Sequence, residues 1–222
     1  MLITNWLPGW KLQALDAQDL FAPYKKEGDF MVRACKILSD LGVMPKVPGR
    51  KGRAGNIVIR DRFPNSHGFL ATGSETDKER MGIKDLTFVT RVYWKEKIVY
   101  SFQDGNLGLD ETILAPTTES LLAGQVFLAN PELTVSIHFH KQLAEGLFHP
   151  QRLIKVRYPA VKESDWRHLR NLTEKGYREI GLLGHTNINK DELDAAFVFG
   201  RDPEETLWRA VRLVKQSSEA GG

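Results

Sequence analysis

Short apolar runs recur along this chain, and polar turns rich in Gly, Pro, Asn or Asp separate them. Runs of this length and spacing predict β-strands. The expected strands are residues 56–60, 68–72, 86–94, 98–102, 133–140, 153–157, 179–183 and 195–200. The first four follow one another closely, which favours antiparallel neighbours in one sheet.

Amphipathic stretches lie between and after these runs and predict four helices, at residues 30–41, 118–129, 163–175 and from 203 onward. The last has a clear start signal, because Asp202 can cap the helix and Pro203 suits its first position. Its apolar stripe is Leu207, Val211 and Val214. Strands alternating with helices predict an α/β fold, in which helices flank a mainly antiparallel sheet.

The length of 222 residues is appropriate for a single domain spanning 1–222. Hydrophobic residues make up 41% of the chain and charged residues 27%, which excludes a disordered or coiled-coil protein. Residues 1–28 carry aromatic side chains with little periodicity, so we expect an N-terminal arm that wraps over the body or a neighbouring subunit without forming a core. Residues 216–222 are expected to form a flexible tail.

The net charge of +3 is too small for a typical nucleic-acid-binding surface. The basic segment 46–53 could face a phosphate or solvent, and nucleic-acid binding through residues 46–62 is a weaker alternative. No apolar run approaches the ~20 residues that cross a bilayer, and the N-terminus lacks a signal-peptide pattern. We therefore expect a cytoplasmic protein with no membrane or nucleic-acid partner.

The single cysteine, Cys35, excludes an intrachain disulfide, and we expect it to be a small buried side chain.

Two histidines, His138 and His140, stand at the end of a predicted strand. Alternate side chains of a strand share a face at roughly 6–7 Å spacing, so both imidazoles could bind one divalent ion. A catalytic metal site needs a third protein ligand and an open position. The candidates are His67, His149, His168 and His185. We favour His185 because it follows a strand, where loops build sites.

Several motifs occur together in a fixed order: Gly55-Asn56-Ile57, Ala71-Thr72-Gly73-Ser74, Pro116-Thr117-Thr118-Glu119, His138-Phe139-His140 and Leu183-Gly184-His185. This ordered set resembles class II aldolase and adducin domains over roughly residues 30–215. The resemblance implies a three-layer α/β/α fold with a mostly antiparallel central sheet. It also implies a homotetramer with sites between subunits.

The resemblance assigns a role to each of these motifs. It implies that His138, His140 and His185 bind Zn²⁺ or another divalent metal such as Mn²⁺, Co²⁺ or Fe²⁺. Glu119 would be the catalytic acid/base, although by itself it indicates only an acid at a helix N-terminus. The substrate phosphate would bind to Asn56, Thr72, Gly73, Thr117 and Thr118.

The implied activity is that of a metal-dependent lyase of carbohydrate metabolism. Such an aldolase would cleave or form a C–C bond in a small phosphorylated ketose through a metal-stabilised enediolate. A dehydratase of methylthioribulose-1-phosphate type, a decarboxylase and an epimerase are alternatives, and a non-catalytic, adducin-like binding or assembly module is another. The chain departs from the family pattern at Thr117 and Thr118, where serines are usual, and at Thr186, where glycine is usual.

Overall fold

The computed structural model describes residues 2–3, 9, 11–16, 22–46, 48–49, 51–62, 66–103, 115–144, 146–156, 162–185 and 192–220. Within these residues, ten strands form one sheet in the order β1-β2-β6-β5-β4-β3-β7-β10-β9-β8. The pairs β2·β6 and β8·β9 are parallel, and the other neighbours are antiparallel. The sheet is therefore mixed and mostly antiparallel, as the sequence predicted.

The strands are β1 (Leu2–Ile3), β2 (Lys11–Asp16), β3 (Asn56–Arg60), β4 (Phe69–Thr72), β5 (Leu86–Tyr93), β6 (Ile98–Gln103), β7 (Val135–His140), β8 (Leu153–Lys155), β9 (Glu179–Leu183) and β10 (Leu193–Gly200). The α-helices are α1 (Lys25–Asp40), α2 (Ser120–Ala129), α3 (Glu163–Glu174) and α4 (Pro203–Ala220). Short 3-10 turns are η1 (Ala22–Tyr24), η2 (Ile83–Asp85) and η3 (Pro150–Arg152).

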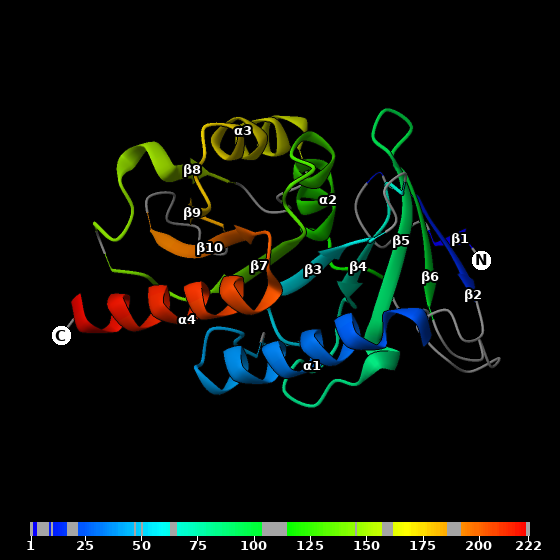
Figure 1. Ribbon diagram of the computed structural model, residues 1–222, viewed down its shortest axis with the longest axis horizontal. Helices are drawn as coiled ribbons and strands as arrows, with labels where there is room; N and C mark the ends of the chain where they lie inside the picture. Colours follow the sequence, from blue (N-terminus) through cyan, green and yellow to red (C-terminus); the bar gives the residue numbers. More distant parts are fainter. Residues whose placement is uncertain are drawn as a thin grey trace.

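Helices cover both faces of the sheet (Figure 1), with α1 and α4 on one face and α2 and α3 on the other. Each face has its own buried apolar cluster. Strand β7 contributes to both faces, because Ile137 and Phe139 pack toward α1 and α4 while His138 stacks on Phe197 on the opposite face. The result is a three-layer α/β/α arrangement in which the alternation of β7 turns its histidines toward one face.

The N-terminal part of the chain differs from the expected arm. Strand β2 joins the sheet beside β6, and Leu12 is fully buried. Helix α1 begins five residues earlier than predicted. Asp29 therefore lies inside the helix, where it pairs with Lys25, and does not cap the helix. Burial of Leu12 and Tyr24 makes this region part of the core.

The C-terminal helix α4 starts as predicted, with the Asp202 carboxylate accepting a hydrogen bond from the Glu205 amide at 2.8 Å. It continues through Ala220, into the segment expected to be a tail. The Ser217 hydroxyl is buried there and accepts from the Ala144 amide at 2.8 Å. None of the helices in the described part of the chain has the length and apolar character needed to cross a membrane.

Candidate metal centre

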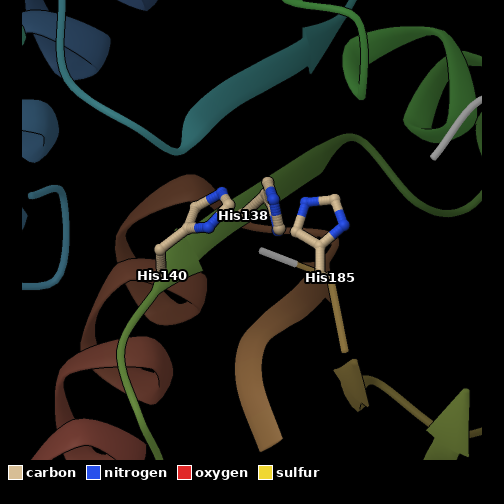
Figure 2. Close-up of side chains that lie close together, drawn as sticks. All are labelled: His138, His140 and His185. Carbon is tan, nitrogen blue, oxygen red and sulfur yellow. The ribbon is translucent and has the colours of Figure 1, made fainter. Parts of the chain in front are cut away.

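Three histidines from distant parts of the sequence meet at one end of the sheet (Figure 2). His138 and His140 lie on β7, and His185 follows β9 after Gly184. Strand β10 lies between β7 and β9 and pairs with both, so the end of β9 is brought beside the end of β7. Gly184 has a φ of 66°, a backbone conformation that side chains disfavour, and this turn directs the chain from β9 into His185.

The three rings are close enough to share one ion. Their centroids are 4.6 Å apart for His138 and His140, 5.1 Å for His138 and His185, and 5.0 Å for His140 and His185. One nitrogen from each lies within 4.8 Å of the others. The side chains are buried, with exposures of 0%, 8% and 1% for His138, His140 and His185. The sequence-based choice of His185 as the third member is thus supported by its position.

The ring nitrogens are positioned to act as ligands. His138 Nδ1 lies 3.0 Å from the Ala196 carbonyl oxygen, to which it can only donate, and this leaves Nε2 with a free lone pair in the neutral ring. Nε2 of His138, Nδ1 of His140 and both ring nitrogens of His185 are buried without a hydrogen-bond partner among the described residues. Buried polar atoms usually have partners. A divalent ion would satisfy these nitrogens, so the donor set fits a metal.

Burial also keeps the imidazoles of His138 and His140 neutral, which ligation requires. Burial and the nearby His185 lower the pKa of His138 to about 4. Burial likewise lowers the pKa of His140 well below its usual value, with His138 and His185 acting in the same direction. Both side chains are therefore ready to bind a cation at neutral pH.

Glu119 occupies the N-cap position of α2, immediately before the first helical residue. Its Oε1 lies 3.8 Å from Nε2 of His185, and its side chain is 13% exposed. Burial raises the pKa of this carboxyl, but His185 and His138 when their rings carry charge, together with hydrogen bonds from its own backbone and the Thr118 side chain, lower it overall. Glu119 is thus an ionised carboxylate beside the histidine cluster.

The residues expected to bind phosphate lie at the same end of the sheet. Asn56 at the start of β3 is opposite His138 in the β3·β7 register. Gly73 bridges to Pro116, and the Thr117 amide donates to the Thr72 carbonyl at 3.2 Å, which joins the end of β4 to the N-terminus of α2. These contacts bring the two motifs beside the histidine cluster.

The residues expected to bind phosphate differ in how many of their side-chain hydrogen-bonding groups are free to contact a ligand. The buried amide of Asn56 and the buried hydroxyl of Thr117 lack hydrogen-bond partners among the described residues. Thr72 already accepts from the Ile57 amide at 3.4 Å. Thr118 is half-buried and interacts with Glu119.

The other candidate histidines are elsewhere and exposed: His67 precedes β4, His149 caps η3, and His168 lies on α3. In the basic segment, the Arg53 guanidinium pairs with Asp77 and Glu79 and so is engaged within the protein. Thr186 lies outside the described residues.

Two buried charged residues near the site were not found from the sequence. Asp194 on β10 accepts a hydrogen bond from the His185 amide at 3.0 Å, and Lys78 is 1% exposed. Asp194 lies within an apolar strand, a context that could have marked it as a buried acid. Lys78 lies in a charged stretch that resembles an ordinary surface turn, so no sequence signal distinguished it.

A scan of protein-family models and a search of curated proteins found no match. Solved structures do match across most of the chain. YgbL from Klebsiella pneumoniae has a TM-score of 0.57 at 15% identity, covering 87% of each chain. An aldolase II superfamily protein from Pseudomonas syringae has a TM-score of 0.57 at 13% identity, covering 90% of this chain and 75% of its own.

L-fuculose 1-phosphate aldolase from Glaciozyma antarctica PI12 has a TM-score of 0.56 at 15% identity, covering 86% of this chain and 72% of its own. At these identities the likeness concerns the fold alone. The chain has the fold of the class II aldolase superfamily.

Proposed function

We propose that this protein is a divalent-metal-dependent lyase that cleaves or forms a C–C bond in a small phosphorylated ketose through an enediolate. The observation that carries the proposal is the convergence of three buried histidines with the carboxylate of Glu119. Each histidine has at least one ring nitrogen without a hydrogen-bond partner among the described residues. The fold likeness to L-fuculose 1-phosphate aldolase supports the substrate class.

His138, His140 and His185 would hold the metal, which we propose to be Zn²⁺ or another divalent ion such as Mn²⁺, Co²⁺ or Fe²⁺. Three protein ligands leave a position open for substrate, as in catalytic zinc sites. When bound, such an ion polarises a substrate carbonyl and stabilises the negative charge of an enediolate.

Glu119 would move the proton at the carbon next to the carbonyl. A general base must be ionised and within reach of its proton, and Glu119 combines a lowered pKa with a carboxylate beside the histidine cluster. Its place at the N-cap of α2 also favours negative charge.

The substrate phosphate would bind where β3, β4 and α2 meet. The amide of Asn56 and the hydroxyl of Thr117 are buried donors that lack partners among the described residues. Thr118 lies close by at a helix N-terminus, which favours an anion. The N–H groups of Gly73 and Thr117 already donate to the Asp85 and Thr72 carbonyls, so these two residues would line the phosphate site. Thr72, the direct neighbour of Thr117, would contribute the proton of its hydroxyl, whose oxygen accepts from the Ile57 amide.

The test is a metal analysis of the purified protein followed by retro-aldol assays on a panel of ketose phosphates. The proposal expects near-stoichiometric metal and cleavage that a chelator abolishes and added metal restores. Metal-free protein without rescue would contradict it and would favour a non-catalytic, adducin-like module.

A second candidate activity is favoured by the likeness to YgbL, which is proposed to be an aldolase, epimerase or decarboxylase. Dehydration of methylthioribulose-1-phosphate belongs in the same group. Assays for dehydration, decarboxylation and epimerisation on the same panel separate these reactions from aldol cleavage.

We also propose that the active assembly is a homotetramer, for which light scattering would give a mass of four times 25.2 kDa.

A further inference from the structure

A lysine is buried next to the candidate metal centre. Lys78 lies between β4 and η2, and only 1% of it is exposed. Lysine is almost never fully buried unless it is paired, because removing an ammonium group from water is costly. The buried ammonium group of Lys78 therefore needs polar or charged partners close by.

The ammonium group is held in place by the chain segment that leads into β3. Lys78 Nζ donates to the Arg53 carbonyl oxygen at 2.8 Å, and the Arg53 amide donates to the Thr76 carbonyl at 3.0 Å. The two segments are in close contact, since a Cβ on Gly52 would lie 2.4 Å from the Glu75 backbone. The cation is thus fixed relative to Asn56, three residues beyond Arg53.

Acidic neighbours in the sequence do not neutralise this ammonium group. Asp77 and Glu79 both pair with the Arg53 guanidinium. Among the described residues, no carboxylate is within ion-pair distance of Lys78 Nζ, and the Arg53 carbonyl is its one hydrogen-bond acceptor. An ammonium has three N–H donors, so two of them have no acceptor in this part of the protein.

The electrostatic influence of Lys78 reaches the site. Burial lowers the pKa of Lys78 overall, while Cys35, Glu119, Glu75 and Asp77 act in the opposite direction, as an anionic ligand would. Lys78 in turn adds to the lowering of the His140 pKa. The groups expected to bind phosphate are all uncharged, so Lys78 is the buried cation that this region offers to a ligand.

We propose that Lys78 is an anion-binding residue of this site, whose buried ammonium supplies positive charge to an anionic oxygen held at the His138, His140 and His185 cluster. This inference rests on the proposed function. It identifies the preferred substrates as those that carry or develop negative charge at the reacting end, such as a carboxylate or an enediolate. Fixed charge in a site that excludes water stabilises such a group more strongly than charge in bulk solvent does.

The test compares two small probes on zinc-loaded protein by calorimetry. Oxalate is a dianion with the shape of an enediolate, and imidazole is a neutral metal ligand. In Lys78→Met the affinity for oxalate should fall about tenfold to hundredfold, the range for a hydrogen bond to a charged group. Zinc content and imidazole affinity should stay unchanged. Lys84→Met, which alters an exposed lysine of η2, is the matched control and should behave like the wild type.

The possible results separate this inference from the proposed function. Wild-type protein that retains no zinc contradicts the proposed function, and the inference falls with it. Zinc-loaded Lys78→Met that binds oxalate as tightly as the wild type contradicts the inference alone. An equal loss of oxalate and imidazole binding also contradicts it, because such a loss indicates general damage to the site. If Lys78→Met does not fold, Lys78→Gln removes the charge in its place, and the same outcomes decide.

Discussion

Each of the three histidines is held in place by a different backbone contact. His138 donates from Nδ1 to the Ala196 carbonyl, whereas the His185 amide donates to the Asp194 carboxylate. The His140 amide donates to the Val43 carbonyl at 2.8 Å, which ties the end of β7 to the loop after α1. Contacts of this kind orient metal ligands before an ion arrives.

Glu119→Gln separates metal binding from proton transfer. The amide has nearly the same size as the carboxylate but cannot accept a proton, so we expect turnover to fall by a factor of roughly 10² to 10⁴. Metal content should remain at the wild-type level, because the three ligands are intact. Measuring kcat and bound metal on the same preparation checks both parts. Turnover that survives, or metal that is lost, would mean that the role is misassigned.

The lowered pKa of His138 predicts how the free energy of unfolding depends on pH in the metal-free protein. Its pKa is about 4 in the folded state, against 6.5 for the free side chain. Between these values the unfolded chain takes up a proton that the folded chain does not, so the free energy of unfolding decreases as pH falls from 6.5 to 4. The loss should be on the order of 3 kcal/mol, from about 1.4 kcal/mol per pKa unit. Above pH 6.5 this residue contributes no pH dependence.

Urea unfolding of chelator-treated protein across this pH range measures the effect. His138→Gln should flatten the slope, whereas His168→Gln, which alters an exposed residue, should leave it unchanged. An identical slope in His138→Gln would show that another group causes the acid sensitivity.

Among the secondary-structure elements, helix α2 packs closely against the sheet at one residue, Gly124. A Cβ on Gly124 would lie 2.4 Å from the Phe69 ring on β4, so the helix can pack at this distance only with glycine there. Gly124→Ala should push α2 outward, destabilise the protein by about 1–3 kcal/mol, and displace Glu119 at the start of the helix. Thermal unfolding and kcat measure the two effects.

Gly82→Ala is the matched control, because no atom lies within 4 Å of an added Cβ at Gly82 and its backbone is extended. It should change stability by less than about 1 kcal/mol. Equal behaviour of the two variants would argue against the close packing of α2.

The central elements were predictable because each carries a strong local signal. The strands of the β3 to β6 meander and β7 have alternating or apolar runs bounded by turns, and α4 has the Asp202-Pro203 start. Strand β2 was not predicted, because the N-terminal residues show little apolar periodicity and Lys11–Asp16 pairs with β6, which is distant in sequence. Such non-local pairing leaves little trace in a local pattern.

At the scale of the whole molecule, the sheet gathers residues that the sequence scatters. His138 and His140 could be identified together because strand periodicity places them on one face. His185 was the favoured one of four candidates, and its place beside them depends on β10 pairing with both β7 and β9. Lys78 went unrecognised for a similar reason, since its burial depends on segments distant in sequence, such as the one that carries the Arg53 carbonyl.

The fold thus gathers buried polar side chains at one end of an otherwise apolar sheet. Helix α2 brings Glu119 from one layer, and the neighbouring strand β3 brings Asn56 to the position opposite His138. Buried polar atoms without partners are costly to a protein that binds nothing there. Their concentration beside the three histidines is best explained by a metal and an anionic substrate.

The most direct test of this account is the metal content of protein purified without added metal, with anomalous scattering to locate the ion. We expect near-stoichiometric divalent metal at His138, His140 and His185, and its loss in His140→Ala with the fold retained. The exposed variant His168→Gln should keep its metal. Wild-type protein that holds no metal and takes up none when it is supplied, or His140→Ala that binds it as well as the wild type, would contradict the account.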